Sequence, residues 1–70
     1  MAWACYKVKL VKRNPAPGPD ESRVAAIDYQ YVSAQAAGRK GYREAARRAE
    51  AKQAREVGPG FTAADVMCVG

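Results

Sequence analysis

Three stretches of the chain alternate between apolar and polar residues, as half-buried β-strands do. The first covers residues 4–13, where the apolar side chains share one side and the lysines share the other. The apolar members are Tyr6, Val8 and Leu10, and the lysines are Lys7 and Lys9. This pattern predicts a strand with its apolar side against a core.

The second and third strands are predicted at residues 23–33 and 61–69. In the second strand, Ala25, Ile27, Tyr29 and Tyr31 form the side expected to be buried, and Asp28 and Gln30 form the polar side. In the third, Ala64, Val66 and Cys68 oppose Asp65, Met67 and Val69. Residues 14–22 contain three prolines and a glycine. They predict a loop between the first two strands, because proline supports neither a central strand nor a helix interior.

A helix is predicted over residues 42–56, where alanine recurs at helical spacing. The predicted contact face comprises Tyr42, Ala45, Ala46, Ala49 and Gln53. An earlier start, at residue 34, stays open because Gly38 and Gly41 each cost a helix about 1 kcal/mol relative to alanine. Gly58-Pro59-Gly60 is expected to end the helix, since proline forbids its continuation.

This order predicts a single α+β domain over residues 1–70, a ββαβ unit with a three-stranded sheet and one long helix on one face. The first strand is expected between the other two, because its alternation is the strongest. The start of that strand would then lie beside the end of the third, bringing Cys5 near Cys68. A disulfide is geometrically conceivable, but two reduced thiols are favoured for a protein expected in the cytoplasm.

The net charge of +5 is concentrated in two places, the first strand and residues 39–48. Such clustering favours a polyanionic partner, either nucleic acid or an acidic protein surface. The alternative is a charged surface that only maintains solubility. The chain has no histidine, no Cys-x-x-Cys pair and no apolar run of about 20 residues. We therefore expect no metal site, no cofactor and no membrane span.

The first candidate surface is the basic edge of the helix. Arg39, Arg43 and Arg47 recur every four residues and form a stripe, with Lys40 and Arg48 beside it. Arginines at this spacing suit a phosphate backbone, and Lys7 and Lys9 of the first strand are assigned to the same function. The competing interpretation is a solvated face with i,i+4 pairs from Glu44 to Arg48 and from Lys52 to Glu56.

The second candidate is Gly38-Arg39-Lys40-Gly41, a G-x-x-G sequence containing two basic residues. It resembles the loop by which KH domains hold a nucleic-acid backbone. The run that follows is similar to the basic start of the last helix in double-stranded-RNA-binding domains. Both resemblances imply contact with nucleic-acid phosphates. The alternative is a flexible connection from strand to helix that needs glycine.

The third candidate is the sheet face that the helix leaves uncovered. Its expected members are Trp3, Lys7, Lys9, Gln30, Val32, Met67 and Val69. Basic residues beside an aromatic suit single-stranded nucleic acid. An exposed patch containing Trp3, Val32, Met67 and Val69 is also typical of a homodimer or partner interface.

The acidic residues show no spacing that forces two carboxylates together, and no nucleophile is paired with a base. The sequence therefore predicts a small non-enzymatic binding protein that engages nucleic acid, or a complex containing it, through the arginine-rich helix edge. The alternative is a protein-docking or inhibitory module that acts through the uncovered sheet face. Chains of this size, charge and layout look like accessory proteins of phages and mobile elements.

Overall fold

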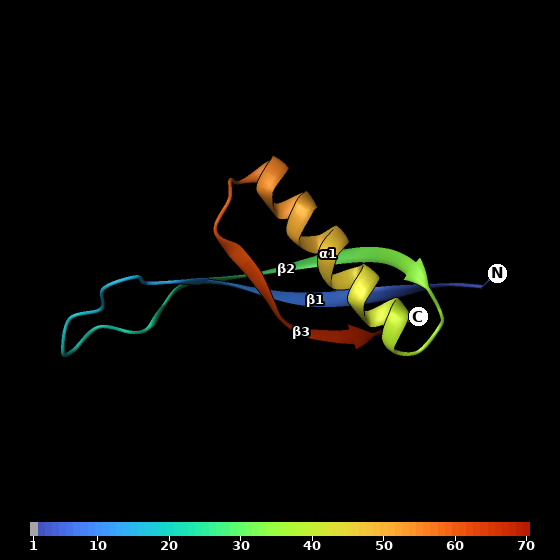
Figure 1. Ribbon diagram of the computed structural model, residues 1–70, viewed down its shortest axis with the longest axis horizontal. Coiled ribbons are helices and arrows are strands. Elements are labelled where there is room, and N and C mark those ends of the chain that lie inside the picture. The colour runs from blue at the N-terminus through green and yellow to red at the C-terminus, as the bar shows by residue number, and fades with distance from the viewer. Residues whose placement is uncertain (1) are drawn as a thin grey trace.

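The computed structural model describes residues 2–70 and contains four elements: β1 (Trp3–Arg13), β2 (Val24–Gln35), α1 (Arg39–Glu56) and β3 (Phe61–Cys68). The predicted ββαβ order and the single helix on one face of a three-stranded sheet are confirmed (Figure 1). The helix begins at Arg39, three residues before the predicted start at Tyr42, and β2 runs two residues past its predicted end at Ser33.

The sheet order is β2-β1-β3, and β1 is antiparallel to both neighbours. The central position predicted for β1 is therefore confirmed. The start of β1 lies beside the end of the chain, where Cys5 N–H donates to the carbonyl of Gly70 at 3.0 Å. Both thiols are free. Cys68 lies opposite Tyr6, so strand alternation directs Cys5 and Cys68 to opposite faces of the sheet.

The core lies between α1 and the sheet. Tyr6, Val8 and Leu10 of β1 are buried there, as their alternation predicts, together with Ala4, Ala34, Ala45 and Ala49. Alanine at the helix contact positions lets α1 lie close to the strands, so the larger β1 side chains supply most of the packed volume. Tyr42, predicted in the contact face, remains 42% exposed. Its ring packs edge-on against the Tyr6 ring, and the two ring centres are 5.4 Å apart.

The predicted orientation of β2 is wrong. The register pairs Tyr6 with Val32 and Val8 with Gln30, so Gln30 and Val32 face the helix. Ile27, Tyr29 and Tyr31, predicted to be buried, lie on the opposite face and are 53%, 48% and 57% exposed. Period-two alternation separates two sides of a strand but does not say which side is buried, because a shift of one residue reverses them.

A buried polar pair accounts for the orientation of β2. Gln53 of α1 is fully buried. Its side-chain oxygen accepts a hydrogen bond from Gln30 Nε2 at 2.6 Å, and its amide donates to Asp28 Oδ2 at 2.8 Å. A buried amide is stable only when its polar atoms have partners. The polar side of β2 provides these partners, and the apolar side would not.

Gly41 is a residue of the first helical turn and not part of a flexible loop. It is buried, and a Cβ added there would overlap the carbonyl oxygen of Gln35 and lie 2.5 Å from the Tyr6 hydroxyl. Gly38, with φ of 57°, lies immediately before the helix. The G-x-x-G sequence therefore has its second glycine in the helix–sheet contact. This placement differs from the KH-type loop that the resemblance implied, because Arg39, Lys40 and Gly41 lie in the helix.

β3 contains an irregularity that the alternation did not predict. The register shifts between Lys9 and Leu10, so that Leu10 lies opposite Ala63. Ala63 consequently packs against the core and Ala64 is exposed. Beyond the bulge, Val66 packs toward the core as predicted.

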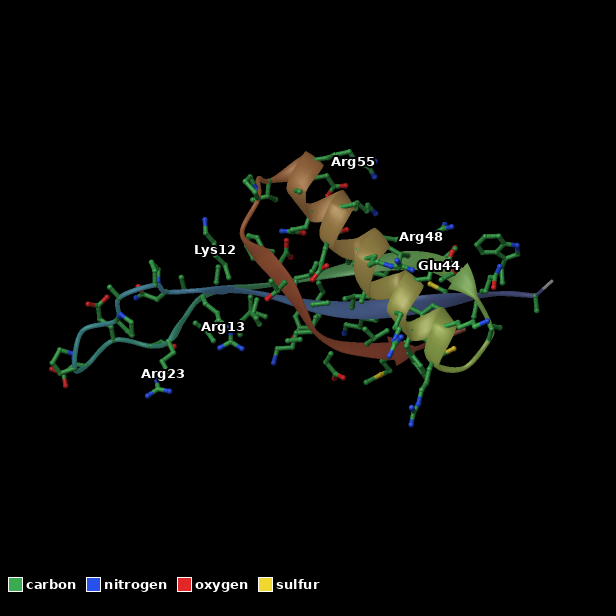
Figure 2. The ribbon with its side chains drawn as sticks, in the orientation of Figure 1. Lys12, Arg13, Arg23, Glu44, Arg48 and Arg55 are labelled. Carbon is green, nitrogen blue, oxygen red and sulfur yellow. The ribbon has the colours of Figure 1, made fainter. Side chains whose placement is uncertain are left out.

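The loop between β1 and β2 projects from the body of the protein (Figure 1) and contributes to overall dimensions of 48 × 21 × 16 Å. It is closed by a hydrogen bond from Asn14 N–H to the carbonyl of Arg23 at 2.8 Å. Glu21 accepts from Gly18 N–H at 3.1 Å within the loop. Lys12, Arg13 and Arg23 lie where the loop joins the strands (Figure 2).

Candidate functional site

The face of the sheet opposite α1 is uncovered, and we call it the open face. Its predicted members include Lys7 and Lys9 of β1, Met67 of β3 and Val69, whose N–H bonds to the carbonyl of Cys5. Val11 of β1, Ile27, Tyr29 and Tyr31 of β2 and Asp65 of β3 lie on the same face. Trp3, also predicted here, instead has its ring 5.3 Å from the Arg48 guanidinium of α1. Val32, predicted as an interface residue, instead packs against the core from the helix side, and Gln30 is buried there.

Two lysines and two tyrosines form the centre of the open face. Lys7 lies opposite Tyr31, and Lys9 lies opposite Tyr29. Side chains directly opposite each other on antiparallel strands have Cβ atoms about 4.5–5.5 Å apart. The Lys7 ammonium also lies 4.8 Å from the centre of the Tyr29 ring. The arrangement is an alternating cluster of ammonium groups and aromatic rings on an accessible surface.

A shallow groove of about 290 Å³ lies on this face, lined by Lys7, Lys9, Tyr29, Asp65 and Met67. Asp65 lies opposite Lys9, and its carboxylate accepts the N–H of Val66 at 3.0 Å. The groove therefore combines the side chains of Tyr29 and Met67 with two cations and one acid. Such a surface suits a ligand that carries both flat apolar groups and negative charge.

A polar network holds β2 against the helix beneath Tyr29. Asp28 accepts from Gln53 and, through its other oxygen, from the main-chain N–H of Tyr29 at 2.8 Å. The hydrogen bond from Gln53 lowers the pKa of the Asp28 carboxyl most, and the bond from the Tyr29 N–H lowers it further. Gln30 also donates to Glu56 at 3.1 Å. The network determines which face carries Tyr29.

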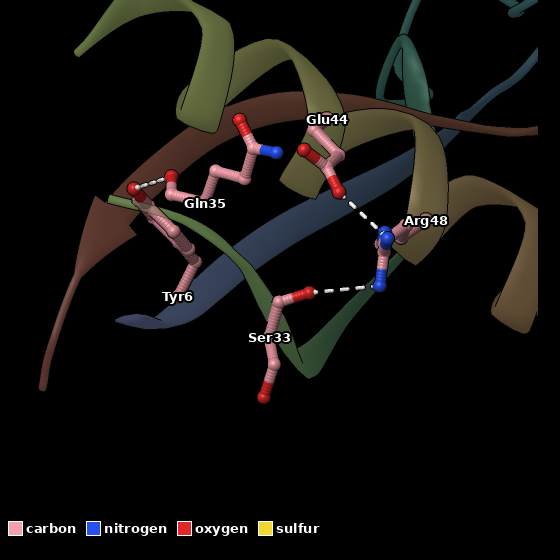
Figure 3. A network of polar contacts seen from close by, with 5 residues as sticks. All are labelled: Tyr6, Ser33, Gln35, Glu44 and Arg48. Atoms are coloured by element: carbon pink, nitrogen blue, oxygen red, sulfur yellow. Dashed lines mark hydrogen bonds and ion pairs between the residues drawn. The ribbon is translucent and has the colours of Figure 1, made fainter. Parts of the chain in front are cut away.

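A second hydrogen bond connects β1 to the segment before the helix. The Tyr6 hydroxyl donates to the carbonyl of Gln35 at 3.0 Å (Figure 3). Burial raises the pKa of Tyr6, with smaller contributions from Cys68, Tyr42 and Glu44. The phenol therefore stays protonated, and this contact is structural.

The basic residues predicted on the helix do not form one surface with the strand lysines. Arg39, Lys40, Arg43 and Arg47 are exposed on α1, on the side of the sheet opposite Lys7 and Lys9. Among residues 2–70, none of these four helix cations forms an ion pair. Glu50 of α1 accepts a hydrogen bond from the main-chain N–H of Ala63 at 2.8 Å, and Glu56 accepts one from the Gln30 amide at 3.1 Å.

Arg48 belongs to a different side of the helix. It pairs with Glu44 at 2.6 Å, as the i,i+4 spacing predicts, and donates to the carbonyl of Ser33 at 3.3 Å (Figure 3). Its guanidinium lies 5.3 Å from the centre of the Trp3 ring. The predicted pair of Lys52 with Glu56 does not occur between the described side chains. Arg48 thus fastens α1 to β2 and is the least available of the predicted contact residues.

Sequence reasoning assigned Tyr29 and Tyr31 to the core and so missed two principal residues of the open face. The amides of Gln30 and Gln53 were the available signal. Two glutamines on surfaces that face each other can satisfy one another, and this favours burying the polar side of β2.

Within residues 2–70, no three cysteine, aspartate or glutamate side chains are grouped so as to hold a metal ion. Among residues 2–70, no helix is both long and apolar enough to cross a membrane. Comparisons with protein-family models, with curated proteins and with solved structures find no significant match to the chain.

Proposed function

We propose that this protein binds single-stranded nucleic acid across the open face. The pairing of Lys7 with Tyr31 and of Lys9 with Tyr29 carries the proposal. Aromatic side chains stack on bases of any sequence, and neighbouring cations neutralise the phosphates. Both elements are present on one accessible surface. The aromatic side chain of α1 itself is Tyr42, whose ring is 42% exposed and packs edge-on against Tyr6.

Stacking of a base on the Tyr29 ring is more favourable in free energy than the contact of that ring with the Lys7 ammonium. The Lys7 ammonium over the Tyr29 ring contributes about 0.5–1 kcal/mol at an exposed site. A stacked base contributes about 1–3 kcal/mol. A base can therefore displace Lys7 from the ring, and the released ammonium is then free to approach a phosphate.

The proposal is tested by fluorescence anisotropy with a labelled ten-nucleotide oligothymidylate at low salt. Tyr29→Ala and Tyr31→Ala should each weaken binding about 5- to 150-fold, the equivalent of one stacked base. The corresponding phenylalanine variants, which keep the rings, should bind nearly as well as the wild type. Equal affinity of the alanine and phenylalanine variants would refute stacking.

The salt dependence distinguishes the open face from the helix edge. Each phosphate contact contributes about −0.7 to the slope of log K against log salt for a single strand, so Lys7→Ala/Lys9→Ala should reduce the slope by about 1.4. Arg43→Ala/Arg47→Ala is the matched control, with two exposed cations removed from α1. If the helix variant loses affinity and slope while the lysine variant does not, nucleic acid binds the helix edge instead.

A protein-docking or inhibitory role on the same face is the second candidate. It is favoured by the exposed apolar side chains Ile27, Met67 and Val69, which are 53%, 56% and 47% exposed. Such a patch also suits self-association as a homodimer. Sedimentation of the pure chain tests this role. A dimer that Met67→Asp dissociates, with no affinity for oligothymidylate, would support docking over nucleic-acid binding.

A further inference from the structure

A second groove, distinct from the open face, lies between α1 and the free edge of β2. It has a volume of about 420 Å³ and is lined by Tyr31, Val32, Ser33, Arg48, Ala51, Lys52 and Arg55. The carboxyl-terminal turns of α1 extend past the β2 side of the sheet (Figure 1) and overhang this edge. The helix contributes residues at i, i+3, i+4 and i+7, which lie on one side of a helix.

The main chain of β2 offers alternating donors and acceptors along this edge. Ala36 N–H donates to the carbonyl of Ala2. This bond fixes which alternate residues of β2 direct their main-chain groups toward β1. The even-numbered residues of β2 therefore bond to β1, and Tyr29, Tyr31 and Ser33 direct their main-chain groups outward. Within residues 2–70, no strand lies beyond β2. Unpaired edges of this kind accept an additional strand.

The edge of β3 differs from that of β2. Two of its outward N–H groups, those of Ala63 and Val66, are occupied by the carboxylates of Glu50 and Asp65, at 2.8 and 3.0 Å. β3 is also shorter than β2, eight residues against twelve, and its register with β1 shifts once. On β2, Asp28 occupies Tyr29 N–H and Arg48 reaches the Ser33 carbonyl. Between residues 2 and 70, no other group pairs with the outward N–H and carbonyl of Tyr31.

The charged side chains that line the groove favour a negatively charged ligand. Arg48, Lys52 and Arg55 supply three cations, and only Arg48 has an ion-pair partner among the described residues. Figure 2 shows Arg48 and Arg55 on this side of α1. A second copy of β2 at the edge would bring its own three cations against these, which like-charge repulsion disfavours. A phosphate backbone would match the charge but could not satisfy the outward carbonyl of Tyr31.

We infer that the free edge of β2 binds an extended acidic peptide, which adds as a fourth strand with its carboxylates beneath Lys52 and Arg55, the groove cations that have no ion pair among the described residues. Lys52 and Arg55 are three residues apart, a rise of about 4.5 Å along a helix. Alternate side chains on one face of a strand are about 6.6 Å apart, so two successive acids on that face lie nearest to the two cations. The expected pattern is therefore an acid at every second residue. The site rests on the β2 edge and the α1 groove, and it does not depend on nucleic-acid binding by the open face.

The test uses a labelled, acetylated and amidated heptapeptide of alternating threonine and glutamate, with binding followed by anisotropy and by amide hydrogen exchange. Binding should protect the amide of Tyr31. Lys52→Ala/Arg55→Ala should weaken peptide binding about 2- to 25-fold, since each surface charge pair contributes a factor of about 1.4 to 5. Arg43→Ala/Arg47→Ala, on the outer side of α1, is the matched control and should bind as the wild type does.

Two altered peptides separate strand addition from general charge attraction. A version with glutamine for glutamate tests the charge, and a version with alternate amides N-methylated tests the main-chain pairing. Both should bind at least tenfold more weakly. Equal binding of either peptide would overturn the inference. Protection of Tyr31 by self-association of the chain without peptide would also overturn it.

Discussion

Replacement of Gln53 by leucine tests which side of β2 is buried. Gln53 is fully buried and bonds to Gln30 at 2.6 Å and to Asp28 at 2.8 Å. Removing one partner of a buried hydrogen bond costs about 1–3 kcal/mol, whereas replacing both partners with apolar groups is nearly neutral. Gln53→Leu should therefore lower the free energy of unfolding by about 1–3 kcal/mol, and adding Gln30→Leu should restore most of the loss.

This effect is large against the stability of the whole domain. A chain of 70 residues is expected to have about 3.5–10 kcal/mol of unfolding free energy, from about 0.05–0.15 kcal/mol per residue. Each 1 kcal/mol corresponds to about 4–8 °C in Tm for a domain of this size. Thermal and urea unfolding of the two single variants and the double variant give a double-mutant cycle.

The opposite orientation of β2 makes the opposite prediction. If Tyr29 and Tyr31 faced the helix, Gln53→Leu would place an apolar side chain against an apolar strand and raise stability. Gln30→Leu would then be an exposed change with little effect. Arg47→Leu, at an exposed helix position, is the control and should alter stability by no more than about 0.5 kcal/mol. A stabilised Gln53→Leu variant would refute the assigned face.

Three further changes test other contacts. At an open helix position, replacing glycine by alanine is favourable by about 1 kcal/mol. Gly41→Ala should instead destabilise the protein by about 1–3 kcal/mol, because its Cβ meets the Tyr6 hydroxyl. A higher Tm would contradict the close contact. The pKa of Asp28 is lowered in the folded state by its bond from Gln53, so stability present above the unfolded pKa should fall as pH drops through the folded pKa. Asp28→Asn should flatten this acid dependence, and an unchanged urea-unfolding profile between wild type and variant would contradict it. Asp65→Asn removes the acid from the open-face groove and should tighten oligothymidylate binding at low salt, whereas unchanged or weaker binding would argue against that groove as the phosphate path.

The buried side of β1 and the end of the helix could be predicted because the residues that determine each of them are close together in the sequence. Lysines alternate with Val8 and Leu10 in β1, so only one side of that strand suits a core. Gly58 and Pro59 end the helix by backbone chemistry that depends on no other element. Together with the apolar–polar alternation of the other two strands and the helical spacing of alanine, these features predicted the ββαβ architecture.

The face of β2 was not predictable from its own pattern. Both sides of that strand carry apolar residues, Ile27 and Tyr29 on one and Val32 and Ala34 on the other. The choice depends on Gln53, which lies 23 residues from Gln30 in the sequence. The start of the helix was missed for a similar reason. Gly41 disfavours a helix locally, but its close packing on Tyr6 requires glycine there.

This reversal of β2 also moved the candidate site. With Tyr29 and Tyr31 exposed beside Lys7 and Lys9, the open face carries both rings and charges. Beside the arginine stripe of α1 the helix has one ring, Tyr42, which packs edge-on against Tyr6, and Arg48 is held by Glu44 and Ser33.

The most direct test of the proposed function is an NMR titration of the labelled protein with oligothymidylate. The account predicts that shift changes concentrate at the side chains of Lys7, Lys9, Tyr29 and Tyr31 and in the adjacent main chain of β1. Changes confined to Arg39, Arg43 and Arg47, or no change at low salt, would contradict it.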